Sequence, residues 1–239
     1  MTLELVRYAD RPGLHERRDP FRRNFPEYMS HNEMGKRYWR RLDDDFADFQ
    51  LVLLDAGEPI AEARSIPVAW DGTLDDLPSG WDTAYERAAE GTGEPNALTA
   101  LWIGIVPGRR GERLGSRMIE AMRGAGRAAG LQALIAAVRP TAKAHYPLIP
   151  IERYARWRRP DGSHFDPWIR LHERVGGEIL RPAPESMTIV APVTDWQEWT
   201  GLTLPEDGDY VVPEMLAPLV VRDGVGRHVE PNVWMRHTI

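Results

Sequence analysis

One stretch in the middle of the chain, residues 101–134, constrains the fold more than any other. It reads LWIGIVPGRRGERLGSRMIEAMRGAGRAAGLQAL. Leu101–Val106 is an apolar run with the length of a buried strand, and a Pro-Gly pair ends it. Apolar residues then return at helical spacing, which predicts a helix over about 111–129 and a second buried strand at 131–138. The stretch therefore predicts a strand, a tight loop, a long helix and a further strand.

The loop before this helix is rich in glycine and arginine. Free N–H groups and the positive end of the helix dipole gather at a helix N-terminus, and both favour a phosphate. Gly111 and Gly115 let an anion approach the backbone, and the neighbouring arginines can pair with phosphate oxygens. The loop therefore predicts a phosphate site, with an ordinary Gly-rich crossover as the alternative. The glycine spacing of dinucleotide-binding folds and the lysine of a P-loop are both missing.

This loop and helix resemble the pyrophosphate motif of the GCN5-related N-acetyltransferase (GNAT) superfamily. In that motif a strand ending in V-x-P is followed by Arg/Gln-x-x-Gly-x-Gly/Ala at the start of a helix. Here Ile105–Pro107 ends the strand, and Arg110, Arg113 and Gly115 stand at the three marked positions. Arg113 departs from the family, which usually has glycine there. Its side chain could crowd the pyrophosphate or, turned outward, supply another cation.

The resemblance implies an α/β (α+β) fold. A mixed, mostly antiparallel central sheet would be flanked by helices, with a V-shaped splay between the two strands around the motif helix. The pantetheine arm of acetyl-CoA, or of another acyl-CoA, would pair with the first strand in that splay, and an N–H near Ile105 would stabilise the oxyanion. Gly104 marks either a bulge, a close backbone approach or a packing position. The cofactor residues implied in this way are Ile103, Gly104, Ile105, Arg110, Gly111, Arg113, Leu114, Gly115 and Ser116.

The resemblance also implies a reaction, the transfer of an acyl group, most often acetyl, to an amine. In the family a tyrosine in a Leu-Tyr-x-x-x-Gly-Phe pattern often protonates the leaving thiolate, and in Leu171–Gly177 that position holds His172. A histidine can donate a proton near neutral pH, or it can pack without catalytic work. Tyr146 and Tyr154 are rival acids. No base stands out, and Glu62, with Glu94 as an alternative, is a candidate because a carboxylate is needed near the amine.

We expect one domain over residues 1–239, with the core motif at 97–180, an insertion at 140–165 and C-terminal strands at 186–239. The insertion either covers the cofactor or is an aromatic-anchored surface excursion. Late strands of the family border the acceptor pocket, which makes Glu230 and Trp234 weaker candidates. Outside the motif the patterns predict strands at 2–9, 50–54, 59–70, 178–180, 186–193, 216–222 and 229–237, and helices at 32–49, 81–89, 166–175 and 195–201.

Composition narrows the function classes. The net charge of −6 and the pI near 5.7 argue against nucleic acid as a partner. The absence of cysteine excludes a thiolate metal site and a cysteine nucleophile, and the histidines lack metal-binding spacing, so we expect no metal. No apolar stretch suits a membrane span, so we expect a cytoplasmic enzyme that acts on a small-molecule or peptide amine, with a homodimer as one option. The alternatives are a non-catalytic acyl-CoA sensor and a different CoA chemistry, such as longer acyl transfer or decarboxylation.

Overall fold

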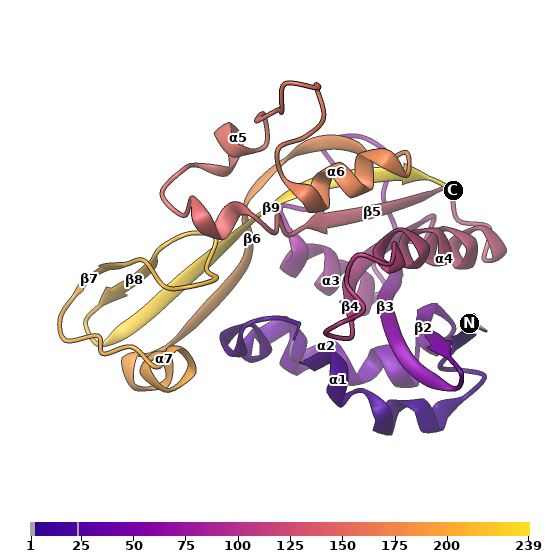
Figure 1. Ribbon diagram of the computed structural model, residues 1–239, viewed down its shortest axis with the longest axis horizontal. Helices are drawn as coiled ribbons and strands as arrows, with labels where there is room; N and C mark the ends of the chain where they lie inside the picture. Colours follow the sequence, from indigo (N-terminus) through magenta and orange to yellow (C-terminus); the bar gives the residue numbers. More distant parts are fainter. Residues whose placement is uncertain (1–2, 23) are drawn as a thin grey trace.

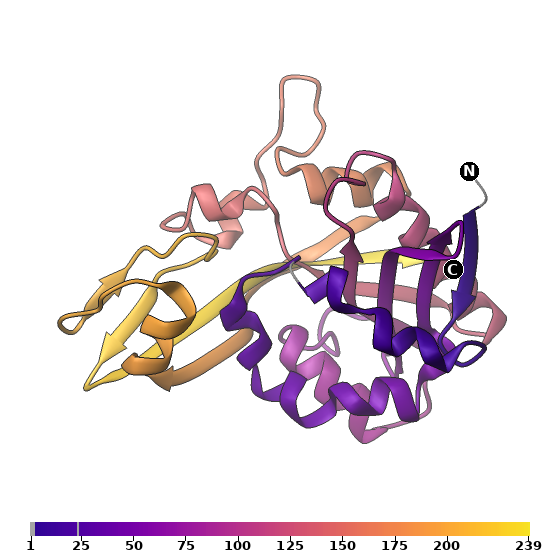
Figure 2. The ribbon, with the colours of Figure 1, turned by 60° about the horizontal axis from the view of Figure 1, so that its bottom comes forward.

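In the computed structural model, which describes residues 3–22 and 24–239, the strands join into one mixed sheet (Figure 1). Every strand pair is antiparallel except β4 with β5. Helices cover both faces of the sheet (Figure 2), so the predicted fold class is confirmed. The strand order is β1 (Leu3–Arg7), β2 (Gln50–Asp55), β3 (Glu58–Val68), β4 (Ala97–Ile105), β5 (Ala133–Val138), β9 (Val225–Thr238), β8 (Leu219–Arg222) and β7 (Gly208–Tyr210), and β6 (Glu178–Pro192) pairs with β9.

The two parallel strands separate halfway along their length. β4 pairs with β5 only over Ala97–Ala100, and the rest of β4 keeps its pairing with β3 alone. At the point of separation Leu101 is an extra residue in the register with β3, and its carbonyl accepts a hydrogen bond from Trp81 Nε1 at 3.0 Å. The V-shaped splay is therefore present, and the bulge of β4 lies at Leu101 rather than at Gly104.

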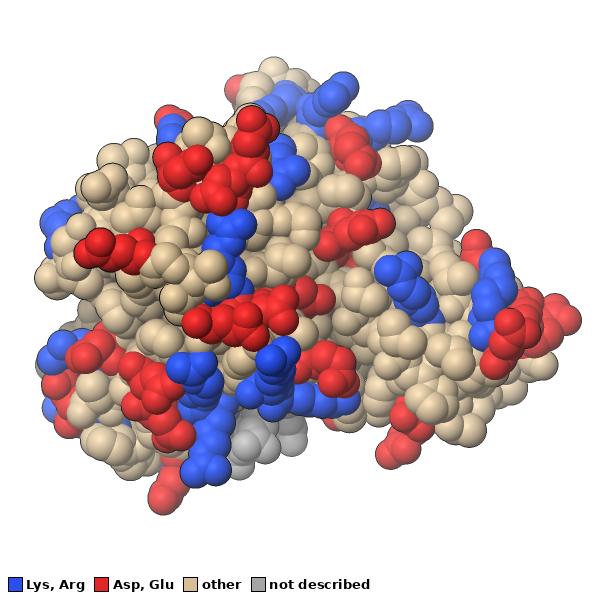
Figure 3. Space-filling view, turned by 180° about the vertical axis from the view of Figure 1, so that it is seen from behind, with Lys and Arg blue, Asp and Glu red and all other residues tan. Residues whose placement is uncertain are grey.

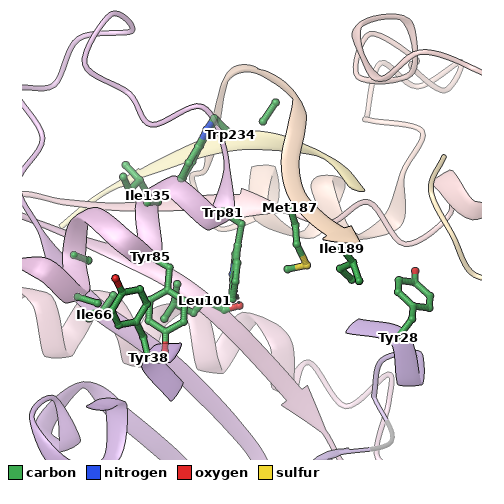
Figure 4. Packing of buried hydrophobic residues seen from close by; sticks show 14 of the residues in the cluster. Tyr28, Tyr38, Ile66, Trp81, Tyr85, Leu101, Ile135, Met187, Ile189 and Trp234 are labelled. Atoms are coloured by element: carbon green, nitrogen blue, oxygen red, sulfur yellow. Dashed lines mark hydrogen bonds between the residues drawn. The ribbon is translucent and has the colours of Figure 1, made fainter. Parts of the chain in front are cut away.

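The helices divide between the two faces of the sheet. On one face α3 (Trp81–Glu90) and α2 (Glu33–Asp44) pack over a core of aromatic residues, in which Trp81 lies between Tyr85 and Met187 (Figure 4). On the other face α4 (Leu114–Ala128) covers β2 to β5, and α6 (Pro167–Arg174) lies beside α4. Shorter helices complete the covering of the sheet: α1 (Asp19–Arg22), α5 (Ile151–Tyr154) and α7 (Val193–Thr200).

The strands β6 and β9 run on past the end of β5 as a long ribbon that carries β7, β8 and α7 away from the rest of the molecule (Figure 1). The two strands predicted at 178–180 and 186–193 are one strand, β6, with register shifts at two places. Pro182 and Pro184 do not divide it, because β6 pairs only with β9 and an edge strand tolerates residues without an N–H.

Two helix boundaries differ from the sequence-based expectation. The predicted helix 32–49 ends at Asp44, and a 3₁₀ turn follows at Ala47–Phe49. The motif helix begins at Leu114 rather than near Gly111, because Arg113 holds a left-handed backbone with φ of +59° and no helix can continue through it. No helix in the described part of the chain is long and apolar enough to cross a membrane.

Charged side chains of both signs are mixed on the face seen from behind (Figure 3). Many of them form ion pairs within one helix or between neighbours, such as Arg41 with Asp45 and Arg37 with Glu90. Such exposed pairs contribute only up to about 1 kcal/mol each.

Candidate active site

The N-terminus of α4, which we call its mouth, has backbone N–H groups without hydrogen-bond partners in the helix. The first helical hydrogen bond runs from Arg117 N–H to the Arg113 carbonyl, so the N–H groups of Leu114, Gly115 and Ser116 have no partner within the helix. No side chain caps this end among the described residues. Three free donors and the positive end of a four-turn helix make a site for an anion.

The arginines of the motif loop fall into two groups. Arg109 is held by Glu112 and Asp55, with N–O distances of 2.6 to 3.1 Å, and it braces the loop against the β2–β3 hairpin. Arg110 and Arg113 are exposed. The left-handed backbone of Arg113 explains why glycine is the usual residue at this position, and its exposed side chain leaves the mouth uncrowded. The substitution thus leaves an exposed cation near the mouth.

Gly115 has a packing role that its sequence position did not reveal. A Cβ at this position would lie 2.7 Å from Cζ3 of Trp168 and 3.5 Å from Leu171, both on α6. No atom lies within 4 Å of the corresponding point at Gly111, whose φ is +93°. Glycine is therefore required at 115 by the contact between α4 and α6, and at 111 by the backbone turn.

The splayed edge of β4 already has a hydrogen-bond partner. The N–H of Ile105 donates to Asn24 Oδ1 at 3.1 Å. A main-chain N–H engaged in this way cannot also stabilise an oxyanion, so the role predicted for Ile105 requires Asn24 to move. Ile103 and Ile105 point their side chains toward α4, where they pack at the edge of its core.

Gly104 and Glu62 lie next to each other on the opposite face of the sheet. They are register partners on β4 and β3, and a Cβ on Gly104 would lie 2.8 Å from Nε1 of Trp102 and 3.5 Å from Cγ of Glu62. Gly104 therefore makes room for the indole of Trp102, which packs against Phe25 with ring centroids 4.3 Å apart and the ring planes tilted by 42°. The Trp102 Nε1 atom is buried and has no partner among the described residues.

The predicted base, Glu62, serves a structural purpose in this conformation. Its side chain is 1% exposed, and it accepts hydrogen bonds from Tyr8 Oη and Arg18 Nε, both at 3.1 Å. Arg64 Nε lies 3.5 Å from the same carboxylate. A base needs a free lone pair that faces the amine. All three neighbours contact Oε2 of Glu62, and Oε1 accepts from Arg18 Nη2 at 3.4 Å, so both carboxylate oxygens have partners within the protein. The role predicted for Glu62 is therefore not supported by its surroundings.

His172 is also unsuited to the role predicted for it. It is 3% exposed, and its Nδ1 shares a hydrogen bond with Nε2 of His237 at 2.9 Å. Burial, with a smaller contribution from His237, lowers the pKa of His172 to about 3. The imidazole is neutral at physiological pH, so it holds no cationic proton to give to a thiolate. In this structure His172 is a buried hydrogen-bond partner of His237, and its surroundings do not favour the predicted role as acid.

The rival tyrosines differ in their surroundings. Tyr154 is fully buried, and its hydroxyl donates to Asp166 Oδ2 at 2.8 Å. The same Asp166 caps α6 through the N–H groups of Trp168 and Ile169. Tyr146 is half-buried against an aromatic group that includes Trp157, and its hydroxyl has no partner in the described part of the chain. Of the two tyrosines predicted as acids, Tyr146 therefore has the hydroxyl that makes no hydrogen bond among the described residues.

A charged network lies at the end of β5, and of its members the sequence analysis named Glu230 but not Arg139. Arg139 directly follows β5, and its Nε donates to Glu230 of β9. Glu230 is 1% exposed and also takes a hydrogen bond from His228 Nε2 at 2.7 Å. Tyr28, from the N-terminal segment, contacts Arg139 through its hydroxyl at 3.3 Å. The sequence feature that could have revealed this network is Arg139, which directly follows the buried strand β5 at the end where β5 has separated from β4.

Comparisons with known proteins agree with this geometry. No family model matches the chain. An arginine N-acetyltransferase of Aspergillus versicolor, avaD, is 32% identical over 97% of this chain and 92% of its own length. The chain belongs to the GNAT superfamily of N-acetyltransferases.

Solved structures support the same fold at low identity. The loading GNATL domain of CurA from Lyngbya majuscula is 15% identical, with a TM-score of 0.65, and the match covers 100% of this chain and 98% of that one. The GphF GNAT-like decarboxylase, solved with isobutyryl-CoA, is 17% identical, with a TM-score of 0.57 and coverage of 100% and 99%. This GNAT member is an acyl-CoA-dependent N-acyltransferase with an amine acceptor, not a non-catalytic sensor, and its acyl donor is acetyl-CoA or another acyl-CoA.

Proposed function

We propose that this enzyme transfers an acetyl group from acetyl-CoA to an amino group of arginine or of a closely related guanidino amine. The observation that carries the proposal is the 32% identity with an arginine N-acetyltransferase over nearly the whole of both chains. The sheet that holds the site is continuous from β1 to β9, so we further propose that residues 1–239 act as one catalytic domain.

The residues at the mouth of α4 fit the diphosphate of CoA. The free N–H groups of Leu114, Gly115 and Ser116 would bind its oxygens, and the exposed Arg110 and Arg113 would add charge. The splayed half of β4, over Ile103–Ile105, would hold the arm. Bound acetyl-CoA supplies an activated acyl thioester.

Side chains and strands of the protein would bring the amine to the thioester, protonate the leaving thiolate and exclude water. The divergence of β4 and β5 beyond Ala100 opens the sheet, so that an amine on the α3 face could meet the thioester from the α4 face. Tyr146 is our candidate for the acid that protonates the thiolate, because its hydroxyl is free and it follows β5 closely. Burial of the surrounding side chains would keep bulk water from the reacting atoms.

The test is release of free thiol from acetyl-CoA with a panel of amines. We expect turnover with arginine or guanidino amines, and none with amines that lack the guanidinium. Arg110→Glu should raise the KM for acetyl-CoA at least tenfold because it reverses a charge at the mouth. Arg127→Glu, a matched change at the exposed far end of α4, should leave that KM unaltered. Turnover confined to amines without a guanidinium would refute the proposed acceptor.

A further inference from the structure

The guanidinium of Arg139 is held by hydrogen bonds in addition to its ion pair with Glu230. Its Nε donates to the buried Glu230, and its Nη2 donates to the Glu214 carbonyl at 2.6 Å and contacts Tyr28 Oη at 3.3 Å. Glu230 is itself held by His228. Three groups from three separate segments of the chain thus fix the plane of one guanidinium.

One of these groups adopts a strained backbone. Glu214 is a non-glycine residue with φ of +67°, in the left-handed region that costs side-chain-bearing residues energy. Its carbonyl accepts from Arg139, while the carbonyl of Leu216, two residues on, accepts from the buried Lys143 Nζ. Backbone strain of this kind persists where the surroundings impose it, and it gathers at functional sites. The loop is therefore shaped around Arg139.

One nitrogen of the Arg139 guanidinium, Nη1, is free to bind a ligand. Among residues 3–22 and 24–239, Nη1 of Arg139 has no hydrogen-bond partner, although Nε and Nη2 are both engaged. The side chain is 18% exposed, so the free end is within reach of a ligand. A planar guanidinium with an unused N–H edge is the group that proteins use to bind a carboxylate.

The position of Arg139 matches the acceptor side of the splay. It is the first residue after β5, at the end where β5 has separated from β4. Its partner Tyr28 belongs to the aromatic core on the α3 face, the face opposite α4. A ligand on Arg139 would therefore lie on the side from which the amine approaches.

We infer that Arg139 binds the carboxylate of an amino-acid acceptor and so selects the amino acid over its decarboxylated or amidated forms. The inference rests on the proposed function and specifies it further. Glu230, Tyr28 and Glu214 are positioning residues that set the direction of Nη1. The other role open to this network, a purely structural link between β5 and β9, makes no distinction between acceptors with and without a carboxylate.

The experiment compares L-arginine with L-argininamide, which keeps the guanidinium and the α-amino group but lacks the negative charge. The main variant is Arg139→Gln combined with Glu230→Gln, so that no buried carboxylate is left without its partner. We expect the ratio of kcat/KM for arginine to that for argininamide to fall about 10- to 100-fold, the range for a hydrogen bond to a charged group. Dividing by the argininamide value cancels any general loss of catalysis in the variant, and the comparison with the wild-type ratio cancels the difference in reactivity between the two amines.

Two further readouts separate binding from folding. The loss should lie in the KM for arginine, with the KM for acetyl-CoA unchanged. Arg139→Lys should retain part of the preference, because the charge remains while the planar fork is lost. Arg40→Gln, on the exposed side of α2, should change nothing.

A double variant that folds and keeps the wild-type ratio would overturn the inference and leave the proposed function standing. Equal use of both acceptors by the wild type would do the same. If the wild type releases no thiol with any amine, the proposed function fails, and calorimetric titration of the CoA-saturated protein then decides about Arg139. Tighter binding of arginine that the double variant loses supports the inference, and equal binding of the two ligands refutes it.

Discussion

Gly115 on α4 lies directly under the indole of Trp168 on α6, so close that a Cβ would come within 2.7 Å of the ring. The same residue carries one of the free N–H groups at the mouth of α4. The contact that locks the two helices together therefore also fixes the direction of the donors that would meet the diphosphate. Gly115 therefore serves both the packing of α4 against α6 and the proposed binding of the diphosphate.

Gly115→Ala tests this contact. The added methyl group should cost about 1–3 kcal/mol through overpacking against Trp168, offset by about 0.5–1 kcal/mol from the better helix propensity of alanine. Gly124→Ala, on the same helix, is the control, because no atom lies within 4 Å of its Cβ position. It should stabilise the protein by about 0.5–1 kcal/mol. Urea unfolding gives both values, and equal stability of the two variants would contradict the contact.

The hydrogen bond from Ile105 N–H to Asn24 Oδ1 leads to a prediction about the cofactor. If the pantetheine arm pairs with the splayed edge of β4, it competes with Asn24 for this donor. Asn24→Ala should then tighten CoA binding about three- to tenfold, the value of one net hydrogen bond. Asn24→Asp should weaken it, since a carboxylate holds the N–H more strongly. Calorimetric titration with CoA decides, and weaker binding to the alanine variant would show that Asn24 supports the bound arm.

The sequence predicted the elements that local patterns encode. The motif strand and its helix were foreseen because an apolar run, a Pro-Gly break and helical spacing are all local signals. The splay of the sheet was expected only because the motif resembles that of the GNAT superfamily. The continuity of β6 was not, since Pro182 and Pro184 end a strand only where both of its edges are paired. That condition depends on which strand lies alongside, and no local pattern contains it.

The candidate site was harder to predict, because the role of a polar residue depends on what surrounds it. His172 occupies the position of a family acid, yet His237, 65 residues away, makes it a buried partner. Glu62 was chosen as a carboxylate near the splay, and Arg18 and Tyr8 from the N-terminal segment surround it. Arg139 was overlooked because its importance comes from partners on other elements.

Glu62→Gln should reduce stability by about 3 kcal/mol. The substitution removes a buried negative charge that faces Arg18 and the fully buried Arg64, and breaking a buried pair is far more damaging than breaking an exposed one. Glu58→Gln is the control, because Glu58 is 76% exposed in its pair with Arg17 and should contribute at most about 1 kcal/mol. Chemical unfolding measures both. A Glu62→Gln enzyme of normal stability without turnover would return Glu62 to the role of base.

The pair His172 and His237 makes stability depend on pH. Burial lowers the pKa of His172 to about 3 and that of His237 to about 4, against about 6.5 in the unfolded chain. Between pH 6.5 and about 4 the unfolded state binds more protons, so the free energy of unfolding falls as the pH is lowered through this range. Each histidine contributes about 1.4 kcal/mol per pH unit at most, and the loss ends below the folded-state pKa values.

His172→Gln should remove up to half of this pH dependence, because the amide does not titrate. Unfolding free energies at pH 7, 6 and 5 measure the slope, and His145→Gln, at an exposed histidine, serves as the control. A slope equal to that of the wild type would show that His172 does not titrate as a buried group. Turnover at neutral pH should persist in His172→Gln, since a neutral buried imidazole has no cationic proton to donate. Loss of turnover with intact CoA binding would restore His172 as the acid in place of Tyr146.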